Sequence, residues 1–269
     1  MKKAVALLGG PVQLWPKDLK DRILVAKKNN DLIFASDRGS QFLLDMGIVP
    51  EVAIGDFDSL KKGELAQLEE YEIDFRYSHP EKDYTDSEQL FKVAFEEYNV
   101  DQLDIYGATG GRLDHFLLNI FTFSKSELKK YCEKIRYIDC QNIIMYILPG
   151  VKKFQAVAGY NYFAVGNLTA VDDLNISGAK YELKNYSSAN PFVFSSNEFV
   201  GLQPIVVSLQ SGEGIIIYSK DINRFYTAKK AKNLKHSWLF YYDNTALIFV
   251  VNISMATLFS PPSGMIISA

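Results

Sequence analysis

The first 125 residues alternate between short apolar runs and longer segments with helical spacing, and this alternation constrains the fold more than any other feature. The apolar runs have the length of buried strands, and the intervening segments carry apolar residues three or four positions apart. The predicted strands are Ala4–Leu8, Asp31–Ala35, Val52–Ile54, Ile73–Tyr77 and Gln102–Tyr106. The predicted helices are Leu19–Lys28, Gln41–Met46, Lys61–Tyr71, Asp83–Tyr98 and Arg112–Ser124, the last with Leu113, Leu117, Ile120 and Phe121 on its apolar side. This order predicts a mainly parallel sheet with helices on both faces.

The pattern changes near Ile143–Pro149, where short alternating runs replace the helical period. Closely spaced short strands indicate an antiparallel sandwich. The candidate strands are Phe154–Val157, Tyr162–Val165, Leu168–Val171, Ala179–Leu183, Phe192–Phe194, Ile205–Leu209 and Gly214–Tyr218. The expected fold is therefore an N-terminal mainly parallel α/β domain at residues 1–148, followed by a C-terminal antiparallel β-sandwich at 149–220.

Residues 221–269 form an atypical C-terminal extension that begins basic and ends apolar. Its apolar run Leu247–Phe259 is interrupted by Asn252 and Ser254. The run falls short of the ~20 residues that a membrane span requires. An additional pair of strands and a non-native extension are both compatible with this segment.

Composition excludes several classes of protein. With 269 residues, 48% hydrophobic and 23% charged, the chain has the mix of a soluble globular protein of one or two domains. The net charge of −3 argues against a nucleic-acid binder. Two cysteines, Cys132 and Cys140, suggest neither a disulfide framework nor a zinc site, so we expect a cytoplasmic protein. The apolar start, Ala4–Leu8, is too short for a signal peptide and is read as a buried strand.

Polar motifs follow the predicted strands or open the predicted helices. Asp37 follows the second strand, Asp56 the third and Gly107 the fifth, while Asp83 and Asp86 begin a helix. Ligands of open α/β sheets bind outside the carboxyl ends of strands, so these motifs are expected to converge. Carboxylates, basic residues and glycine turns together suit a divalent metal that holds a polyphosphate.

Each motif has an alternative structural interpretation. Asp56 and Asp58 are expected to project to one side, with Phe57 pointing into the core, and Mg²⁺ would relieve their repulsion. A solvated acidic turn, with Ser59 capping a helix, explains the same residues equally well. Asp83 and Asp86 share a helix face at i, i+3, with Lys82 beside them for phosphate, although acidic residues are common in any first helical turn.

The third motif is the glycine-rich turn Gly107–Gly111, which precedes a helix. Glycines let a backbone approach a ligand, and a helix N-terminus favours an anion. Arg112 is placed to contact phosphate, and Asp114 to orient a substrate hydroxyl or amine. A plain strand–turn–helix connection is the alternative. Gly9-Gly10-Pro11 is first a strand-ending turn, and His79 and His115 are too scattered for a metal site.

Taken in order, these motifs resemble the thiamine pyrophosphokinase family. The matching pieces are Asp37–Gly39, Gly55–Ser59, Glu81–Asp86 and Gly107–His115, together with Ser195–Glu198 in the second half. The resemblance covers roughly residues 1–220. It implies a homodimer that transfers the terminal diphosphate of ATP to the hydroxyethyl group of thiamine and releases AMP, with Mg²⁺ required.

The resemblance also implies roles for individual residues. Asp56, Asp58 and Asp86 resemble ligands of Mg²⁺ or Mg-ATP, with Asp37 assisting. Asp114 would meet thiamine, and Ser196 of the partner subunit would meet its pyrimidine. The implied catalytic set is Asp56, Asp58, Asp86, Arg112 and Asp114, and the implied binding set is Asp37, Lys82, Asp83, Thr109, Arg112, Ser196 and Asn197.

The chain departs from the family pattern at a few positions. Many members carry glycine where this chain has Arg38 and alanine where it has Ser40, which leaves the role of Arg38 open. Tyr181 stands where some members carry tryptophan. Two other functions stay open: a pyrophosphokinase for another hydroxymethyl compound such as a pterin, and a catalytically silent nucleotide- or thiamine-binding protein. The pair Ser196-Asn197 favours thiamine over a pterin, and the complete carboxylate set favours an enzyme.

Overall fold

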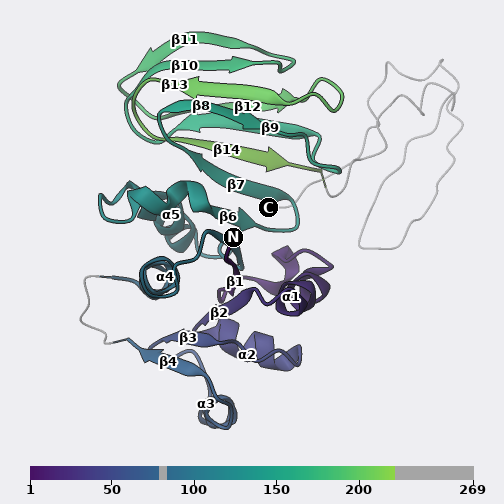
Figure 1. Cartoon of the computed structure of the whole chain (residues 1–269), viewed down its shortest axis with the longest axis vertical. Coiled ribbons are helices and arrows are strands. Elements are labelled where there is room, and N and C mark those ends of the chain that lie inside the picture. Colours follow the sequence, from purple (N-terminus) through teal and green to yellow (C-terminus); the bar gives the residue numbers. More distant parts are fainter. Residues whose placement is uncertain (79–83, 222–269) are drawn as a thin grey trace, which may run out of the picture. The chain divides into compact units, whose positions relative to one another are not determined.

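The computed structural model describes residues 1–78 and 84–221 of the chain. The main element of this part is a ten-stranded sheet (Figure 1). Residues 1–220 form a single compact unit, to which the description below refers. The strand order is β12-β9-β14-β7-β6-β5-β1-β2-β3-β4. No helix among the described residues has the length and apolar character needed to cross a membrane.

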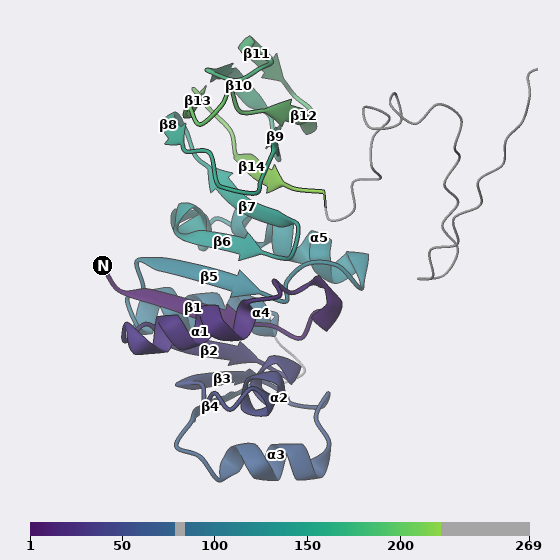
Figure 2. The ribbon, with the colours of Figure 1, turned by 90° about the vertical axis from the view of Figure 1, so that its right-hand side faces the viewer.

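Six neighbouring strands of this sheet are parallel, and Figure 2 shows the central ones side by side with their arrowheads in one direction. They are β6 (Ile135–Ile138), β5 (Gln102–Tyr106), β1 (Lys3–Leu7), β2 (Leu32–Ser36), β3 (Val52–Gly55) and β4 (Asp74–Tyr77). The central strands β1, β2 and β3 are apolar runs because both faces of the sheet are covered there, whereas the edge strand β4 carries Asp74 and Arg76. The expected parallel α/β half is therefore confirmed.

Helices cover both faces of the parallel strands, as Figure 1 shows. Along β1, Val5 and Leu7 pack with helices α1 (Leu19–Lys28) and α2 (Arg38–Asp45). Ala4 and Ala6 point to the opposite face, where α4 (Asp86–Lys92), its π-helical continuation η2 (Val93–Glu97) and α5 (Leu113–Phe121) pack. Helix α3 (Lys62–Glu69) connects β3 to β4, and short 3₁₀ turns lie at Val12–Leu14, Thr122–Ser124 and Lys129–Lys134.

The second half forms an antiparallel sandwich. One layer is the continuation of the large sheet, with β7 (Asn142–Ile147), β14 (Gly214–Ser219), β9 (Tyr162–Asn167) and β12 (Phe192–Glu198). The other layer is a four-stranded sheet of β11 (Leu183–Ser188), β10 (Val171–Ser177), β13 (Ile205–Leu209) and β8 (Gly150–Phe154). Residues from both layers share one apolar cluster, with Phe163 and Val165 from one and Leu174 and Val207 from the other. The two halves thus share one sheet, and a boundary at 148/149 stays a prediction.

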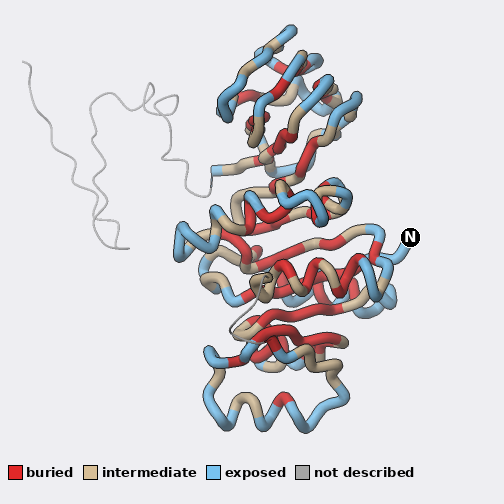
Figure 3. Tube along the Cα trace, turned by 90° about the vertical axis from the view of Figure 1, so that its left-hand side faces the viewer, coloured by how far each residue is buried: buried red, intermediate tan, exposed pale blue. Residues whose placement is uncertain are grey.

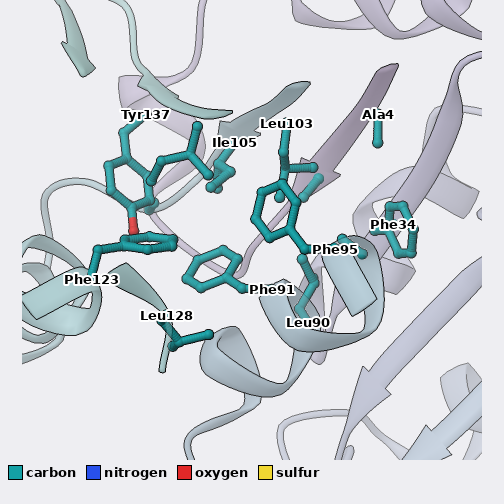
Figure 4. Packing of buried hydrophobic residues seen from close by; sticks show 14 of the residues in the cluster. Ala4, Phe34, Leu90, Phe91, Phe95, Leu103, Ile105, Phe123, Leu128 and Tyr137 are labelled. Carbon is teal, nitrogen blue, oxygen red and sulfur yellow. The ribbon is translucent and has the colours of Figure 1, made fainter. Parts of the chain in front are cut away.

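An aromatic cluster holds α5 against the sheet (Figure 4). Figure 3 shows that buried positions run along the central strands of this sheet. Phe91 lies 5.0 Å from Phe123, ring centre to ring centre, and Phe123 lies 5.3 Å from Tyr146. The hydroxyl of the fully buried Tyr137 donates to the Asn119 carbonyl oxygen at 2.9 Å, and that of Tyr146 donates to the Ile120 carbonyl oxygen at 2.8 Å. Both hydrogen bonds satisfy backbone groups near the end of α5, so the helix is fixed by apolar and polar contacts together.

Several helix predictions were wrong in detail. Helix α4 begins at Asp86 rather than Asp83, because Thr85 and Glu88 form a capping box, with the Thr85 amide donating to Glu88 Oε2 at 2.8 Å. The predicted apolar side of the last helix is also wrong. Ile120 is buried, but Leu113, Leu117 and Phe121 are 71%, 52% and 45% exposed.

Candidate active site

A cleft with a volume of about 940 Å³ lies at the carboxyl ends of the parallel strands. Its wall comes from the turns after β1, β2, β3, β4 and β5, from the start of α4, and from one side of α5. The acidic residues in this wall are Asp37, Asp56, Asp58, Asp86 and Glu88. The strand-end motifs of the sequence therefore do converge, as the topology of a parallel sheet requires.

Asp37 has an unusual backbone conformation and a raised pKa. It lies between β2 and α2 with φ = 45° and ψ = −119°, outside the left-handed helical region in which aspartate is usually found at positive φ. Its Oδ1 accepts a hydrogen bond from the Phe57 amide at 3.3 Å. A Cβ on Gly55 would collide with the same Oδ1, so this close approach requires glycine. Burial, and then the neighbouring charge of Asp86, raise the pKa of Asp37 to about 7.

Asp56 and Asp58 flank the buried ring of Phe57 in the loop after β3. Phe57 packs against Phe75 and Tyr77 at 5.7 and 5.4 Å between ring centres, while both aspartates are exposed in the cleft wall. As expected, Phe57 points into the core and the two aspartates point to solvent. This arrangement comes from a turn rather than an extended strand, because Phe57 has φ = 56°. The adjacent charge of Asp56 raises the pKa of Asp58.

Asp86 is the first residue of α4 and lies near Asp37. The Ser78 hydroxyl, directly after β4, donates a hydrogen bond to Asp86 Oδ1. Two carboxylate pairs thus share the cleft: Asp37 with Asp86, whose charge raises the pKa of Asp37, and Asp56 with Asp58. Such pairs repel when both members are ionised, and a cation between them removes the repulsion.

The donor set fits a hard divalent cation, although no ready-made ligand cage is present. In residues 1–78 and 84–221, no three histidine, cysteine or acidic side chains come together as a complete metal site. Mg²⁺ commonly takes only one or two carboxylates and fills its remaining positions with water and substrate phosphate. Two pairs of carboxylates in an open cleft match that mode of binding better than an all-protein cage.

The glycine turns after β1 and β5 form the opposite wall. The Gly10 amide donates to the Gly107 carbonyl oxygen at 2.9 Å, and a Cβ on Gly10 would collide with that oxygen. Arg112, at the N-cap of α5, lines the cleft and forms a bidentate ion pair with Asp114, with Nε–Oδ1 at 3.1 Å and Nη2–Oδ2 at 2.5 Å. This arginine holds the pKa of Asp114 down at about 2.

Some residues singled out by the sequence lie elsewhere. Thr109 is buried, and its hydroxyl donates to Asp139 Oδ2 at 2.8 Å rather than lining the cleft. Ser196 and Asn197, on β12, are also absent from the cleft wall of their own chain. Lys82 and Asp83 fall outside the described residues.

Ser196 and Tyr181 are nevertheless brought together by Asn197. The buried Asn197 side chain donates to the Tyr181 carbonyl oxygen at 2.7 Å and accepts from the Tyr181 amide at 3.1 Å. The pairing of β12 with β9 shifts register between Phe194 and Asn197, and Ser196 there has φ = 61°. Asn197 therefore ties the bulge in β12 to the backbone of Tyr181. Ser196, in this bulge, and Tyr181 are both exposed.

Sequence reasoning missed several residues of the cleft wall. The strand-end rule that selected Asp37 and Asp56 also selects Ser78, which follows β4, and it was overlooked. Asn119 and Lys125 gave no local signal, because tertiary contacts bring them to the cleft. Asn119 bonds Ser87 Oγ at 3.3 Å and the Ala108 carbonyl oxygen at 2.9 Å, while Lys125 pairs with the buried Glu88 at 2.6 Å.

Comparison with known proteins identifies the family. Residues 25–135 match the model for "Thiamin pyrophosphokinase, catalytic domain", and residues 153–213 match that for "Thiamin pyrophosphokinase, vitamin B1 binding domain". The chain is 35% identical over 186 residues to the thiamine pyrophosphokinase of Bacillus subtilis, an alignment that spans 69% of this chain and 83% of that protein. The chain belongs to the thiamine pyrophosphokinase family. It is accordingly an enzyme of the kind that forms thiamine diphosphate from thiamine.

Solved structures of the family have the same fold. A thiamin pyrophosphokinase family protein from Enterococcus faecalis superposes with a TM-score of 0.75 at 30% identity and covers 82% of this chain and all of its own. The thiamine pyrophosphokinase of Bacillus subtilis gives a TM-score of 0.69 at 30% identity, with the same coverage. Both the parallel α/β half and the sandwich predicted from the sequence are therefore family features.

Proposed function

We propose that this chain transfers the terminal diphosphate of ATP to the hydroxyl of the hydroxyethyl group of thiamine, with Mg²⁺ bound in the cleft, and releases AMP. The observation that carries this proposal is the convergence of Asp37, Asp56, Asp58 and Asp86 from three separate turns into one cleft. Diphosphoryl transfer depends on in-line positioning and on neutralising charge, and both need several oxygen ligands and cations around one space.

The carboxylates hold the metal in this proposal. Asp56, Asp58 and Asp86 supply ligands, and Asp37, whose pKa the charge of Asp86 raises, assists them. Bound Mg²⁺ supplies positive charge that neutralises the phosphate oxygens and orients the reacting phosphorus. The Ser78 hydroxyl fixes the orientation of Asp86, and the buried Phe57 fixes the loop that carries the other two aspartates.

The opposite wall receives the phosphates and thiamine. The turn Gly107–Gly111 and Arg112 bind phosphate oxygens, and the family resemblance also assigns ligand-binding roles to Lys82 and Asp83. Thr109 contributes by fixing this turn through its bond to Asp139, since its hydroxyl is not in the wall. Asp114 meets thiamine, so substrate binding requires Arg112 to exchange part of its pairing with Asp114 for phosphate.

The direct test is an assay with ATP, Mg²⁺ and either thiamine or a hydroxymethylpterin, in which AMP and the diphosphorylated product are measured. Product from thiamine alone supports the proposal. Product from the pterin alone would replace it with a related pyrophosphokinase activity. Nucleotide binding without any product would identify a silent binding protein.

We further propose a homodimer in which Ser196 and Asn197 of one subunit complete the cleft of the other. Neither residue lines the cleft of its own chain, although β12 displays Ser196 on an exposed bulge. Helix α5, which carries Asp114, also exposes an apolar stripe at i, i+4 and i+8, formed by Leu113, Leu117 and Phe121. A partner subunit that covers this stripe would lie beside Asp114.

Leu117→Asp tests the shared site. A charge placed in the apolar centre of an interface is expected to raise the dimer dissociation constant at least about ten-fold. Sedimentation velocity reports the dissociation, and specific activity should fall on dilution and recover at high protein concentration. Leu24→Asp, at an exposed leucine of α1, is the matched control and should stay dimeric and active. A fully active monomer would refute the shared site.

We propose catalytic and thiamine-binding domains at residues 1–148 and 149–220, with residues 221–269 as an extension not required for catalysis. Every residue assigned a chemical role precedes Asp221, and the family-model matches end at residue 213. A cytoplasmic location fits the two unpaired cysteines, Cys132 and Cys140.

Removal of residues 221–269 is expected to leave turnover within about two-fold of the full chain, because no residue assigned a chemical role lies in this segment. The truncated protein should either behave normally or lose solubility while its soluble fraction keeps its turnover. The measurement is AMP release per mole of soluble protein. A soluble, dimeric truncation that binds Mg-ATP but transfers no diphosphate would place the extension in the active site.

A further inference from the structure

Arg38 occupies a distinctive position among the cations of the cleft. Within the described part of the chain, three permanently charged basic side chains line the cleft: Arg38, Arg112 and Lys125. Arg112 is engaged in a bidentate pair, and Lys125 is bound to a carboxylate that is 1% exposed. Arg38 uses only Nη1, which donates to Glu64 Oε2 at 2.6 Å and to the Ser59 carbonyl oxygen at 3.5 Å.

The unused edge of Arg38 is the one that makes bidentate contacts elsewhere in this protein. Nε and Nη2 together bind both oxygens of a carboxylate in three pairs: Arg76 with Asp74, Arg112 with Asp114, and Arg136 with Asp104. In Arg38 the same two nitrogens have no hydrogen-bond partner among the residues that the structure describes. A guanidinium edge of this kind matches the spacing of two phosphate oxygens.

The neighbours of Arg38 hold its guanidinium in place. Glu64 is itself fixed, because its Oε2 also accepts the Lys61 amide at 2.9 Å in the capping box of α3. The ring of Phe42, one turn along α2, lies 5.6 Å from the guanidinium carbon. A side chain held at one nitrogen and over one ring loses less freedom when it binds a ligand, so more of the contact appears as affinity.

The charge around Arg38 indicates which ligand it would take. The residue follows Asp37 directly and shares the cleft wall with Asp56, Asp58 and Ser59. This end of the cleft is strongly acidic and would repel a polyphosphate unless a cation lies beside the carboxylates. Arg38 lines the cleft at this acidic end. It directly follows Asp37 in the sequence, and it donates a hydrogen bond to the Ser59 carbonyl oxygen in the loop that carries Asp56 and Asp58.

We propose that Arg38 binds the phosphate groups of the nucleotide through its Nε–Nη2 edge, with Glu64 and the Ser59 carbonyl holding the guanidinium in position. This inference rests on the proposed function, because it requires a nucleotide in the cleft.

The test is calorimetric titration of the full chain with ATP and Mg²⁺. Arg38→Met is expected to weaken nucleotide binding about ten-fold or more, since it removes charge-assisted hydrogen bonds. The nucleotide affinity of Arg38→Lys should fall between those of the unmodified chain and Arg38→Met, because lysine keeps the positive charge but lacks the paired nitrogens of the guanidinium. Glu64→Gln should weaken binding by less than about three-fold, because an amide oxygen still accepts a hydrogen bond from Nη1.

Arg76→Met is the matched control. Arg76 forms a bidentate pair and a second ion pair with Glu97, but does not line the cleft, so nucleotide affinity should be unchanged. Thermal unfolding of every variant separates loss of fold from loss of binding.

Two results would overturn the inference. One is a folded Arg38→Met protein that binds ATP within two-fold of the unmodified chain. The other is a Glu64→Gln protein that loses as much affinity as Arg38→Met, which would show that the arginine only fixes the loop. Assaying thiamine diphosphate formation by the unmodified chain separates the two proposals. ATP binding that depends on Arg38 without product formation would refute the proposed function and leave this inference standing.

Discussion

Replacing Asp58 by asparagine should lower the rate of thiamine diphosphate formation by about 10²–10³ and leave the fold intact. The substitution keeps the shape of the side chain and removes one of the charges that, in the proposed function, hold Mg²⁺ and the phosphates. Asp58 is exposed, and the bond between its amide and Asp56 Oδ1 at 3.1 Å is a backbone contact that asparagine preserves. The apolar anchor of the loop, Phe57, is likewise untouched.

The measurement is AMP release at saturating thiamine over a series of Mg²⁺ concentrations, with circular dichroism to monitor the fold. A higher Mg²⁺ requirement in the variant would locate the loss at the metal rather than at thiamine. Asp21→Asn, at an exposed carboxylate of α1 outside the cleft, should retain normal activity. Near-normal turnover by a folded Asp58→Asn protein would remove Asp58 from the metal site.

The parallel half of the fold was predictable because its physics is local. Buried parallel strands are covered on both faces and therefore appear as short apolar runs, as in β1 and β3. The predicted positions of β1 to β5 agree with the structure to within one or two residues at each end. β6 (Ile135–Ile138) was not predicted. It directly follows the 3₁₀ turn Lys129–Lys134, and its four residues include the charged Arg136, so the apolar signal is weak.

The sandwich strands were predicted less accurately because bulges and pairing register set them. The predicted run Ala179–Leu183 overlaps only the first residue of β11, and Leu168–Val171 only the first of β10. The pairing of β10 with β11 shifts register twice between Val171 and Ile176. Such shifts change the face on which a side chain lies, so simple alternation misplaces the strand ends.

The residues of the candidate site likewise divide into those that could be predicted from the sequence and those that could not. Residues directly after a strand, such as Asp37 and Asp56, follow from topology alone. Thr109 illustrates the limit, because its place in the motif predicts ligand contact, whereas its hydroxyl bonds the buried Asp139. The stripe of Leu113 and Leu117 illustrates another, since helical spacing of apolar residues does not distinguish a core face from a face left for a partner.

Asp37→Asn should stabilise the metal-free protein at pH 8 and abolish most of its activity. Asparagine has nearly the same shape as aspartate and retains an oxygen that can accept a hydrogen bond from the Phe57 amide. The substitution removes a carboxylate whose ionisation is unfavourable, because the group is partly buried and lies near the charge of Asp86. A stability gain of about 2 kcal/mol is expected at pH 8, together with a loss of activity of about 10².

The direction of the pH dependence follows from the pKa of Asp37, which is about 7 in the folded chain against 3.8 ordinarily. Between these values the folded protein keeps a proton that the unfolded chain has released. The contribution of Asp37 to the free energy of unfolding is therefore greatest near pH 4 and is lost as the pH rises through 7. The variant lacks this carboxyl and should not show the loss, so its advantage over the unmodified chain grows from pH 5 to pH 8.

Urea unfolding in EDTA at pH 5 and pH 8 measures this difference, and AMP release measures the activity. Mg²⁺ should narrow the stability gap at pH 8, because a bound cation relieves the repulsion between Asp37 and Asp86 in the unmodified protein only. A gap that is unchanged by Mg²⁺ would separate Asp37 from the metal. The raised pKa predicts that the stability advantage of Asp37→Asn over the unmodified chain is larger at pH 8 than at pH 5. An advantage that is smaller at pH 8 than at pH 5 would contradict the raised pKa itself.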